Sequence, residues 1–172
     1  MRRLFKAFFA ILIAGGAFLF ISSVLFPLIY RIKEPCFKPP VSSELVVRND
    51  AYGEGAFGAK RKNGRTHSGL DLAAKLKSPV YASKSGWARA YCVPSGYGNL
   101  VIIKHPGGAE TRYGHLHRST VINPGWVRQG AVIGYIGKTG NAGERGIMPH
   151  LHFEIRHKGV PVDPAGELVK KR

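Results

Sequence analysis

The sequence predicts a mainly β domain of antiparallel strands, preceded by one apolar N-terminal helix. Short segments that alternate apolar and polar residues recur along the chain, and turns rich in glycine and proline separate them. After residue 31, no stretch keeps a helical period over ten residues. Hydrophobic residues make up 44% of the 172 residues, which suits one folded domain and excludes a mostly disordered chain.

The N-terminal region predicts a membrane-spanning helix. No charged residue occurs from Ala7 to Tyr30, and this run exceeds the roughly 20 residues that cross a bilayer. It is also longer than the apolar part of a secretory signal peptide, and no small-residue cleavage site follows it. We therefore expect a retained membrane anchor at residues 1–30, with its N-terminus inside the cell.

Two further regions follow the anchor. Residues 31–45 contain three prolines, which oppose regular structure, so this segment predicts a tether. Residues 46–172 predict a single domain without internal repeats. Its candidate strands are "ELVVRN" (44–49), "SPVYAS" (78–83), "GWARAYCV" (86–93), "NLVIIKH" (99–105), "ETRYGHLH" (110–117), "AVIGYIG" (131–137) and "HLHFEIRH" (150–157).

The formal net charge of +16 comes from 26 basic and 10 acidic residues. Such a charge attracts polyanions. An anchored domain outside the cell meets anionic envelope polymers and lipid head groups before it meets nucleic acid, so we expect the envelope polymers as partners and disfavour nucleic acid. A basic surface that only maintains solubility is the alternative.

The last candidate strand carries two histidines and a glutamate in one register. Successive side chains of a strand point to opposite faces, so His150, His152 and Glu154 share one face, while apolar residues share the other. One face therefore predicts core and the other predicts chemistry. For Glu154 we favour an exposed salt bridge, and the alternative is that it orients a histidine.

A second motif, "HSGLD", predicts metal ligands. In an extended segment His67, Gly69 and Asp71 face the same way, and the glycine leaves room for an ion between the other two. A histidine nitrogen and a carboxylate oxygen, with a third protein ligand and one water, make up a catalytic zinc site. His152 can supply the third ligand.

Six segments between about residues 55 and 164 resemble the M23 family of zinc metallopeptidases, the lysostaphin and LytM type. They are "FGAKRKNGRTHSGLDLAA", "SPVYASKSGWARA", "GYGNLVIIKHPGG", "TRYGHLH", "VRQGAVIGYIGKTGN" and "PHLHFEIRHKGVPVDP". The resemblance implies a twisted antiparallel sheet whose groove holds one zinc ion per chain. It also implies an endopeptidase that cuts peptide bonds in bacterial peptidoglycan, within stem or cross-bridge peptides.

The resemblance assigns a role to each site residue. It implies that His67, Asp71 and His152 bind the metal and that His115 and His150 are catalytic without binding it. Zinc lowers the pKa of its water towards about 7 and polarises the scissile carbonyl. The two catalytic histidines then share three tasks, namely accepting the water's proton, stabilising the oxyanion and protonating the leaving amine.

Three other histidines, His105, His117 and His157, are interpreted as surface residues or as supports for the site residues. Together with the anchor, the resemblance implies a single-pass protein of the bacterial inner membrane whose catalytic domain faces the periplasm or the exterior. The alternative function is a catalytically silent relative that binds the wall or activates another wall hydrolase. Because all five site residues are present, we favour the enzyme.

Two features lie outside the motifs. The segment "TGNAGERGIMPHLH" (139–152) is longer than the compact form of many relatives and predicts a different groove wall, with a different choice of substrate. Cys36 and Cys92 are the only cysteines of the sequence, and an oxidising compartment would allow them to pair. Two free, buried thiols are the alternative.

Overall fold

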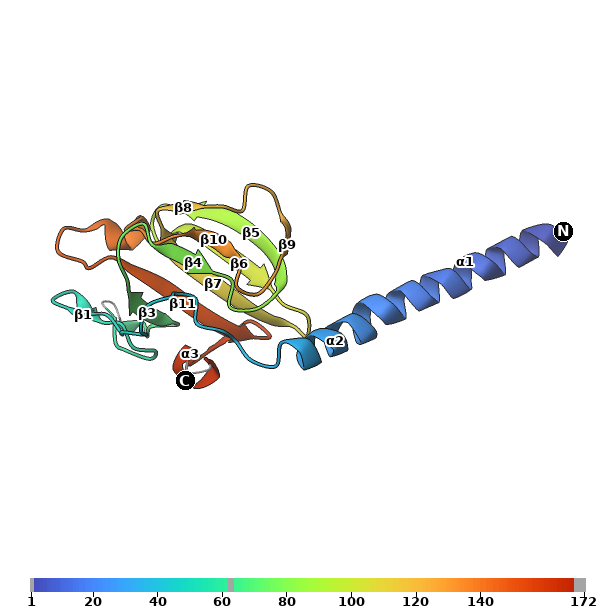
Figure 1. Cartoon of the computed structure of the whole chain (residues 1–172), viewed down its shortest axis with the longest axis horizontal. Helices are drawn as coiled ribbons and strands as arrows, with labels where there is room; N and C mark the ends of the chain where they lie inside the picture. The colour runs from blue at the N-terminus through green and yellow to red at the C-terminus, as the bar shows by residue number, and fades with distance from the viewer. Residues whose placement is uncertain (1, 62–63, 169–172) are drawn as a thin grey trace. The chain divides into compact units, whose positions relative to one another are not determined.

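The computed structural model describes residues 2–61 and 64–168 (Figure 1). The chain divides into two compact units, of which the first ends at Pro35 and the second begins at Cys36. The first unit contains α1 (Arg2–Phe20), a π-helical turn η1 (Ile21–Leu25) and α2 (Phe26–Lys33). A proline stands in the first turn of α2, where its missing N–H is tolerated best.

The membrane-spanning helix predicted at residues 1–30 is not confirmed. Among the residues whose structure is described, no helix is both long enough and apolar enough to cross a membrane.

The second unit consists mainly of antiparallel strands, which confirms the predicted fold class. The strands are β1 (Asn49–Asp50), β2 (Gly53–Glu54), β3 (Leu70–Ala73), β4 (Pro79–Tyr81), β5 (Gly86–Val93), β6 (Gly98–Lys104), β7 (Ala109–Leu116), β8 (Arg118–Ser119), β9 (Gly125–Val127), β10 (Val132–Tyr135), β11 (His150–His157) and β12 (Val160–Val162). Two short helical turns, η3 (Gly140–Gly143) and α3 (Pro164–Glu167), complete the described elements of this unit.

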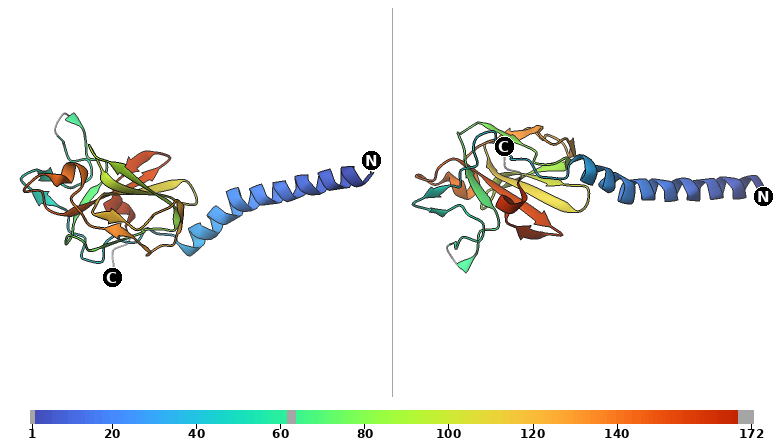
Figure 2. Two further views of the ribbon diagram at one scale, coloured as in Figure 1. Left: turned by 90° about the horizontal axis from the view of Figure 1, so that it is seen from above. Right: turned by 60° about the horizontal axis from the view of Figure 1, so that its bottom comes forward.

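Three sheets form from these strands. The largest has seven strands in the order β12-β11-β7-β6-β5-β9, with β3 paired to the free part of β11. A second sheet has the order β4-β10-β8, and β1 pairs with β2. Two further views show the strands of this unit from other directions (Figure 2).

Most of the predicted strands are confirmed. The segments that begin at residues 78, 86, 99, 110, 131 and 150 all contain β-strands. The segment 44–49 is different, because only its last residue belongs to a strand, β1. Its backbone instead runs beside β3, where Ala73 N donates to Val46 O over 2.8 Å and Arg48 N donates to Asp71 O over 2.8 Å.

Residues that precede the predicted start of the domain at residue 46 belong to the compact second unit. Phe37 and Val41 are buried in its core, and Phe37 bridges to Leu168 near the other end of the described chain. Tyr81 N also donates to Pro40 O over 2.8 Å. Backbone hydrogen bonds and apolar burial therefore fix this segment to the sheet.

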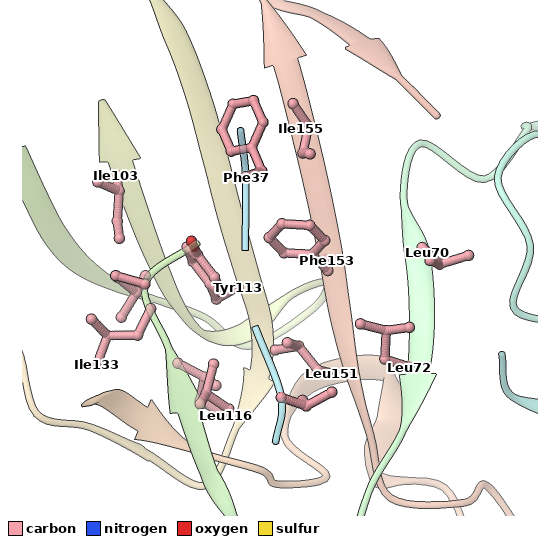
Figure 3. Packing of buried hydrophobic residues seen from close by; sticks show 14 of the residues in the cluster. Phe37, Leu70, Leu72, Ile103, Tyr113, Leu116, Ile133, Leu151, Phe153 and Ile155 are labelled. Carbon is pink, nitrogen blue, oxygen red and sulfur yellow. The ribbon is translucent and has the colours of Figure 1, made fainter. Parts of the chain in front are cut away.

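The hydrophobic core lies where the seven-stranded and three-stranded sheets face each other. Figure 3 shows Phe153 and Leu151 of β11 beside Tyr113 of β7, with Ile133 of β10 nearby. Leu151, Phe153 and Tyr113 are 0% exposed, and the rings of Phe153 and Tyr113 lie 5.3 Å apart between centroids. The apolar face of the last predicted strand is therefore core, as its alternation predicts.

Phe153→Ala tests how much this packing contributes. Removing a fully buried ring leaves a cavity beside Tyr113, so we expect the free energy of unfolding to fall by about 3–5 kcal/mol. Denaturant unfolding of the purified protein measures the change. Val160→Ala is the matched control, since Val160 is 64% exposed and its truncation should change stability by less than about 0.5 kcal/mol. Equal effects of the two variants would contradict this description of the core.

The predicted disulfide is not formed, because Cys36 and Cys92 are both free and exposed. The Cys36 carbonyl accepts a hydrogen bond from Gln129, whose side chain also donates to Ser83 O, just before β5 begins. Cys92 lies near the other end of β5, about 20 Å further along the strand. A disulfide spans at most about 7 Å between Cα atoms. The two thiols are therefore too far apart to pair. Because both are exposed, the alternative of two free, buried thiols is wrong about their burial.

Candidate metal and catalytic site

Strand pairing brings the two histidine motifs together. His152 of β11 stands opposite Asp71 of β3 on one side and opposite Gly114 of β7 on the other. His115 follows Gly114 directly, and His67 lies four residues before Asp71. The central position of β11 therefore places side chains from three distant segments around His152.

Three atoms of the predicted ligands converge. His67 Nε2 lies 3.0 Å from Asp71 Oδ1 and 3.0 Å from His152 Nδ1, and the last two atoms lie 2.8 Å apart. All three side chains are buried. Donor atoms around a tetrahedral zinc ion at about 2.0–2.1 Å lie about 3.3 Å from one another. The spacing therefore fits one ion of this size after shifts of a few tenths of an ångström.

The outer hydrogen bonds of both histidines fix their tautomers. His67 Nδ1 lies 2.8 Å from Ala56 O, and a carbonyl oxygen only accepts, so Nδ1 carries the proton. His152 Nε2 likewise donates to Glu154 Oε1 over 3.0 Å. The lone pairs of His67 Nε2 and His152 Nδ1 then point at each other and at a carboxylate oxygen. Three acceptors meeting without a donor form a site for a cation.

Asp71 keeps one oxygen for that site because two arginines hold the other. Arg48 donates to Asp71 Oδ2 over 3.1 Å, and Arg61 donates to the same atom over 3.0 Å. Burial opposes ionisation of Asp71, but the hydrogen bonds from the two guanidinium groups to Oδ2 favour the charged carboxylate. Asp71 is therefore an anionic ligand with Oδ1 directed at the histidines.

Glu154 does not form the exposed salt bridge that the sequence favoured. It is 0% exposed, because Ser68 and Tyr97 cover it on this face of β11. Its Oε1 accepts hydrogen bonds from His152, Ser68 and Tyr97, and its Oε2 accepts one from Arg156 over 2.6 Å. The alternative, that Glu154 orients a histidine, is the one the geometry supports.

Gly69 was predicted to leave room for an ion between His67 and Asp71, but the structure gives its missing side chain another role. A Cβ at Gly69 would lie 2.5 Å from Phe153 O and 2.8 Å from Glu154 Cγ. The missing side chain therefore allows β11 to approach the His67 segment closely, rather than leaving room for an ion. The close approach is what brings His152 within reach of His67.

His115 and His150 lie beside the three acceptors. The two rings are 5.0 Å apart between centroids, and His150 Nε2 lies 4.0 Å from Asp71 Oδ1. His115 Nδ1 donates to Thr139 O over 2.9 Å, and His150 Nδ1 donates to Met148 O over 2.7 Å. Each ring thus keeps the lone pair of Nε2, which suits it to accept a proton.

Both rings are neutral at neutral pH. Burial, followed by the repulsion that a proton on His150 or His152 would exert, lowers the pKa of His115 to about 3. Burial also lowers the pKa of His150. His115 has a positive φ of 59°, a left-handed conformation that costs energy for a non-glycine residue, and hydrogen bonds at its backbone N and ring Nδ1 hold it there.

Two of the remaining histidines have the predicted surface positions, whereas His105 is buried beside Phe37 of the core. His105 is buried, with Nδ1 2.9 Å from Ser85 O and Nε2 2.8 Å from Thr111 Oγ1. His117 and His157 are exposed.

The five residues lie at an open cleft of about 540 Å³. One wall carries Asn141, Ala142, Glu144 and Ile147 of the long segment that was predicted to alter the groove. This segment is fastened at two points, because Tyr52 OH donates to Arg145 O over 2.5 Å and Met148 N donates to Asp50 Oδ2 over 3.1 Å. The extra length therefore forms an ordered wall.

Glu154→Ala tests the support of His152. It would leave His152, Ser68, Tyr97 and Arg156 without their shared acceptor, so we expect a loss of about 3–5 kcal/mol in unfolding free energy. We also expect zinc affinity to fall about 10-fold to 100-fold. Chelator competition and denaturant unfolding measure the two effects.

Glu110→Ala is the matched control, because Glu110 pairs with Arg112 near the surface and its loss should cost less than about 1 kcal/mol. Unchanged zinc affinity in folded Glu154→Ala would show that His152 needs no such support.

The fold and the site define a class of antiparallel β domain in which two histidines and one carboxylate converge in a cleft as a candidate metal site. Within that class, the chain belongs to peptidase family M23, whose sequence profile matches residues 65–164. The sequence resemblance to this family is thereby confirmed.

Named relatives agree with this assignment. Over 100 residues the chain is 45% identical to the DD-carboxypeptidase/endopeptidase Mpg of Neisseria meningitidis, a match that covers 58% of this chain and 22% of Mpg. A zinc containing peptidase from Vibrio cholerae superimposes with a TM-score of 0.60 at 32% identity, over 74% of this chain and 39% of that one. The catalytic domain of lysostaphin from Staphylococcus simulans gives 0.55 at 27%, over 72% and 97%.

Proposed function

We propose that the chain is a zinc-dependent endopeptidase that hydrolyses peptide bonds in bacterial peptidoglycan. One observation carries the proposal, namely that three acceptor atoms converge beside two neutral histidines in an open cleft. Membership of peptidase family M23 supports hydrolysis, and the name of the Neisseria relative supports an endopeptidase. Because the chain spans only about a fifth of that relative's length, substrate and partners are part of the proposal.

His67, Asp71 and His152 would hold one zinc ion per chain. When bound, zinc supplies Lewis-acid activation of water and of the scissile carbonyl. Arg48 and Arg61 keep Asp71 Oδ2 occupied, so that Oδ1 stays directed at the two nitrogens. A site of this kind is assembled before substrate arrives, because each ligand is held by a hydrogen bond on its outer side.

His115 and His150 would move the protons of the reaction. Each has Nδ1 committed to a backbone carbonyl and a neutral Nε2, which can take a proton from the attacking water. The ring that takes this proton can then donate it from Nε2 to the leaving amine, while Nε2 of the other ring can accept a hydrogen bond that orients the water. Burial lowers the pKa of both rings, so a ring that has taken up a proton is a strong acid towards the leaving amine.

The substrate would be a stem or cross-bridge peptide of the wall, so the site would act on the wall side of the envelope. The net charge of +16 favours attraction to anionic envelope polymers near this substrate. A catalytically silent regulator of another hydrolase is the rival. The presence of all five site residues, with ligand atoms 2.8–3.0 Å apart, favours the enzyme.

The test is to incubate the zinc-loaded full-length chain with purified peptidoglycan of several wall types and to identify released peptides by mass spectrometry. We expect new peptide termini that disappear when zinc is chelated and return when it is restored. The product masses identify the bond that is cut.

Binding to peptidoglycan without release of any peptide would instead support the silent regulator.

A further inference from the structure

The wall of the cleft next to His67 is basic. Residues 60–61 and 65–66 lie along this wall, with Lys60 bridged to Thr66 and Arg61 N donating to Arg65 O over 2.7 Å. Among the described residues that line the cleft, four are cations and two are carboxylates. They are Arg48, Lys60, Arg61, Arg65, Asp71 and Glu144.

Two of the four cations are already neutralised by the site. Arg48 is 4% exposed and pairs with Asp50 over 2.6 Å and with Asp71 over 3.1 Å. Arg61 pairs with Asp71 over 3.0 Å. Both arginines therefore act on the metal ligand, and their charge is not available to a ligand in the cleft.

Lys60 and Arg65 are different. Both are exposed at the cleft, and neither forms an ion pair with a carboxylate among the residues that the structure describes. Glu144, the other described carboxylate of the cleft, belongs to the opposite wall. The two cations therefore present uncompensated charge on one wall only, so the field in the cleft has a direction.

We propose that Lys60 and Arg65 form a carboxylate-binding subsite, and that the preferred substrate is a peptide with a free carboxylate near the scissile bond. The inference rests on the proposed function and specifies its substrate class. A guanidinium binds a carboxylate through two parallel hydrogen bonds, and an ammonium beside it adds charge without fixing a geometry. A ligand held on this wall would lie across the cleft, with its peptide bond at His67, Asp71 and His152.

Local charge is distinct from the overall charge of the chain. An exposed cation acts over about 8 Å at physiological ionic strength, so cations elsewhere on the surface hasten encounter without selecting a ligand in the cleft. Lys104 of β6 provides a comparison, because it is exposed and does not line the cleft. Selectivity for one carboxylate of a peptide should depend on Lys60 and Arg65 and be independent of Lys104.

The test uses synthetic cross-linked stem peptides in which each carboxylate in turn is replaced by a carboxamide. For the zinc-loaded full-length chain we expect kcat/KM to fall about tenfold for one of these replacements. In the double variant Lys60→Met/Arg65→Met, the ratio of kcat/KM for the free peptide to kcat/KM for the amidated peptide should fall to about one. Lys104→Met should keep the ratio of the unaltered chain. Zinc content and melting temperature of every variant check that the site and the fold persist.

Two results would overturn the inference. The first is a preference for the free over the amidated peptide that persists in the double variant. The second is an equal loss of this preference in Lys104→Met, which would show that the chain attracts anions only in general. Binding of the same peptides to zinc-loaded His115→Ala, measured by calorimetry, separates the subsite from the proposed activity. If no peptide is cleaved by any form of the chain, the proposed function fails. A carboxylate-dependent affinity that vanishes on adding the Lys60→Met/Arg65→Met changes would still support the subsite.

Discussion

His152→Ala is expected to abolish both zinc binding and peptide hydrolysis. The variant removes one of three protein ligands and leaves His67 Nε2 and Asp71 Oδ1, a pair that cannot complete the site. It also removes the donor to Glu154, so that the remaining ligands lose their central support. Elemental analysis after dialysis measures zinc per chain, and release of peptides from peptidoglycan measures activity.

His117→Ala is the matched control for this experiment. His117 is exposed and follows the same strand as His115, so its loss should leave zinc content and turnover within about twofold of the unaltered chain. Full zinc occupancy in folded His152→Ala would remove His152 from the ligand set and with it the proposed site.

His115→Ala and His150→Ala are expected to retain zinc and to lose most of the activity. Loss of a general acid or base costs on the order of 10² to 10⁴ in turnover. Neither side chain supplies an atom to the group of converging acceptors, so the metal content should stay near one per chain. Zinc content, melting temperature and peptidoglycan cleavage are measured together for both variants.

A second substitution at His115 is needed because the backbone there has a positive φ. Alanine at φ 59° is strained, whereas asparagine adopts the left-handed conformation more readily. His115→Asn should therefore keep more of the stability than His115→Ala while losing as much activity. Near-normal turnover in folded, zinc-loaded His115→Asn and His150→Ala would show that these histidines are structural.

Patterns within short stretches of the sequence were enough to predict one strand of the sheet and the residues of the site. Alternation within residues 150–157 places His150, His152 and Glu154 on one face and the apolar residues in the core, because side-chain direction in a strand depends only on sequence parity. The family motifs name five residues, and the structure brings all five to one cleft. These inferences need no knowledge of which strands are neighbours.

The contacts that the sequence did not predict are made between segments that lie far apart in the chain. Glu154 was expected at the surface, but Ser68 and Tyr97 cover it, and both reach it from segments more than 50 residues away. The contacts of Arg48 and Arg61 with Asp71 depend likewise on how loops return to β3. The register between distant strands is set by packing of the whole sheet, which no local motif encodes.

The orienting contacts of His67, His115 and His150 are all made by main-chain carbonyls, those of Ala56, Thr139 and Met148. Every amino acid carries a carbonyl, so these contacts require no particular side chain at Ala56 or Met148, whereas the Thr139 side chain has hydrogen bonds of its own to Asn99 N and Leu116 O. Two of the carbonyls, at Thr139 and Met148, belong to the segment 139–152 that carries the long wall of the cleft. The backbone of the wall therefore also sets the orientation of His115 and His150, so a change in the course of this wall would turn the two rings as well as reshape the cleft.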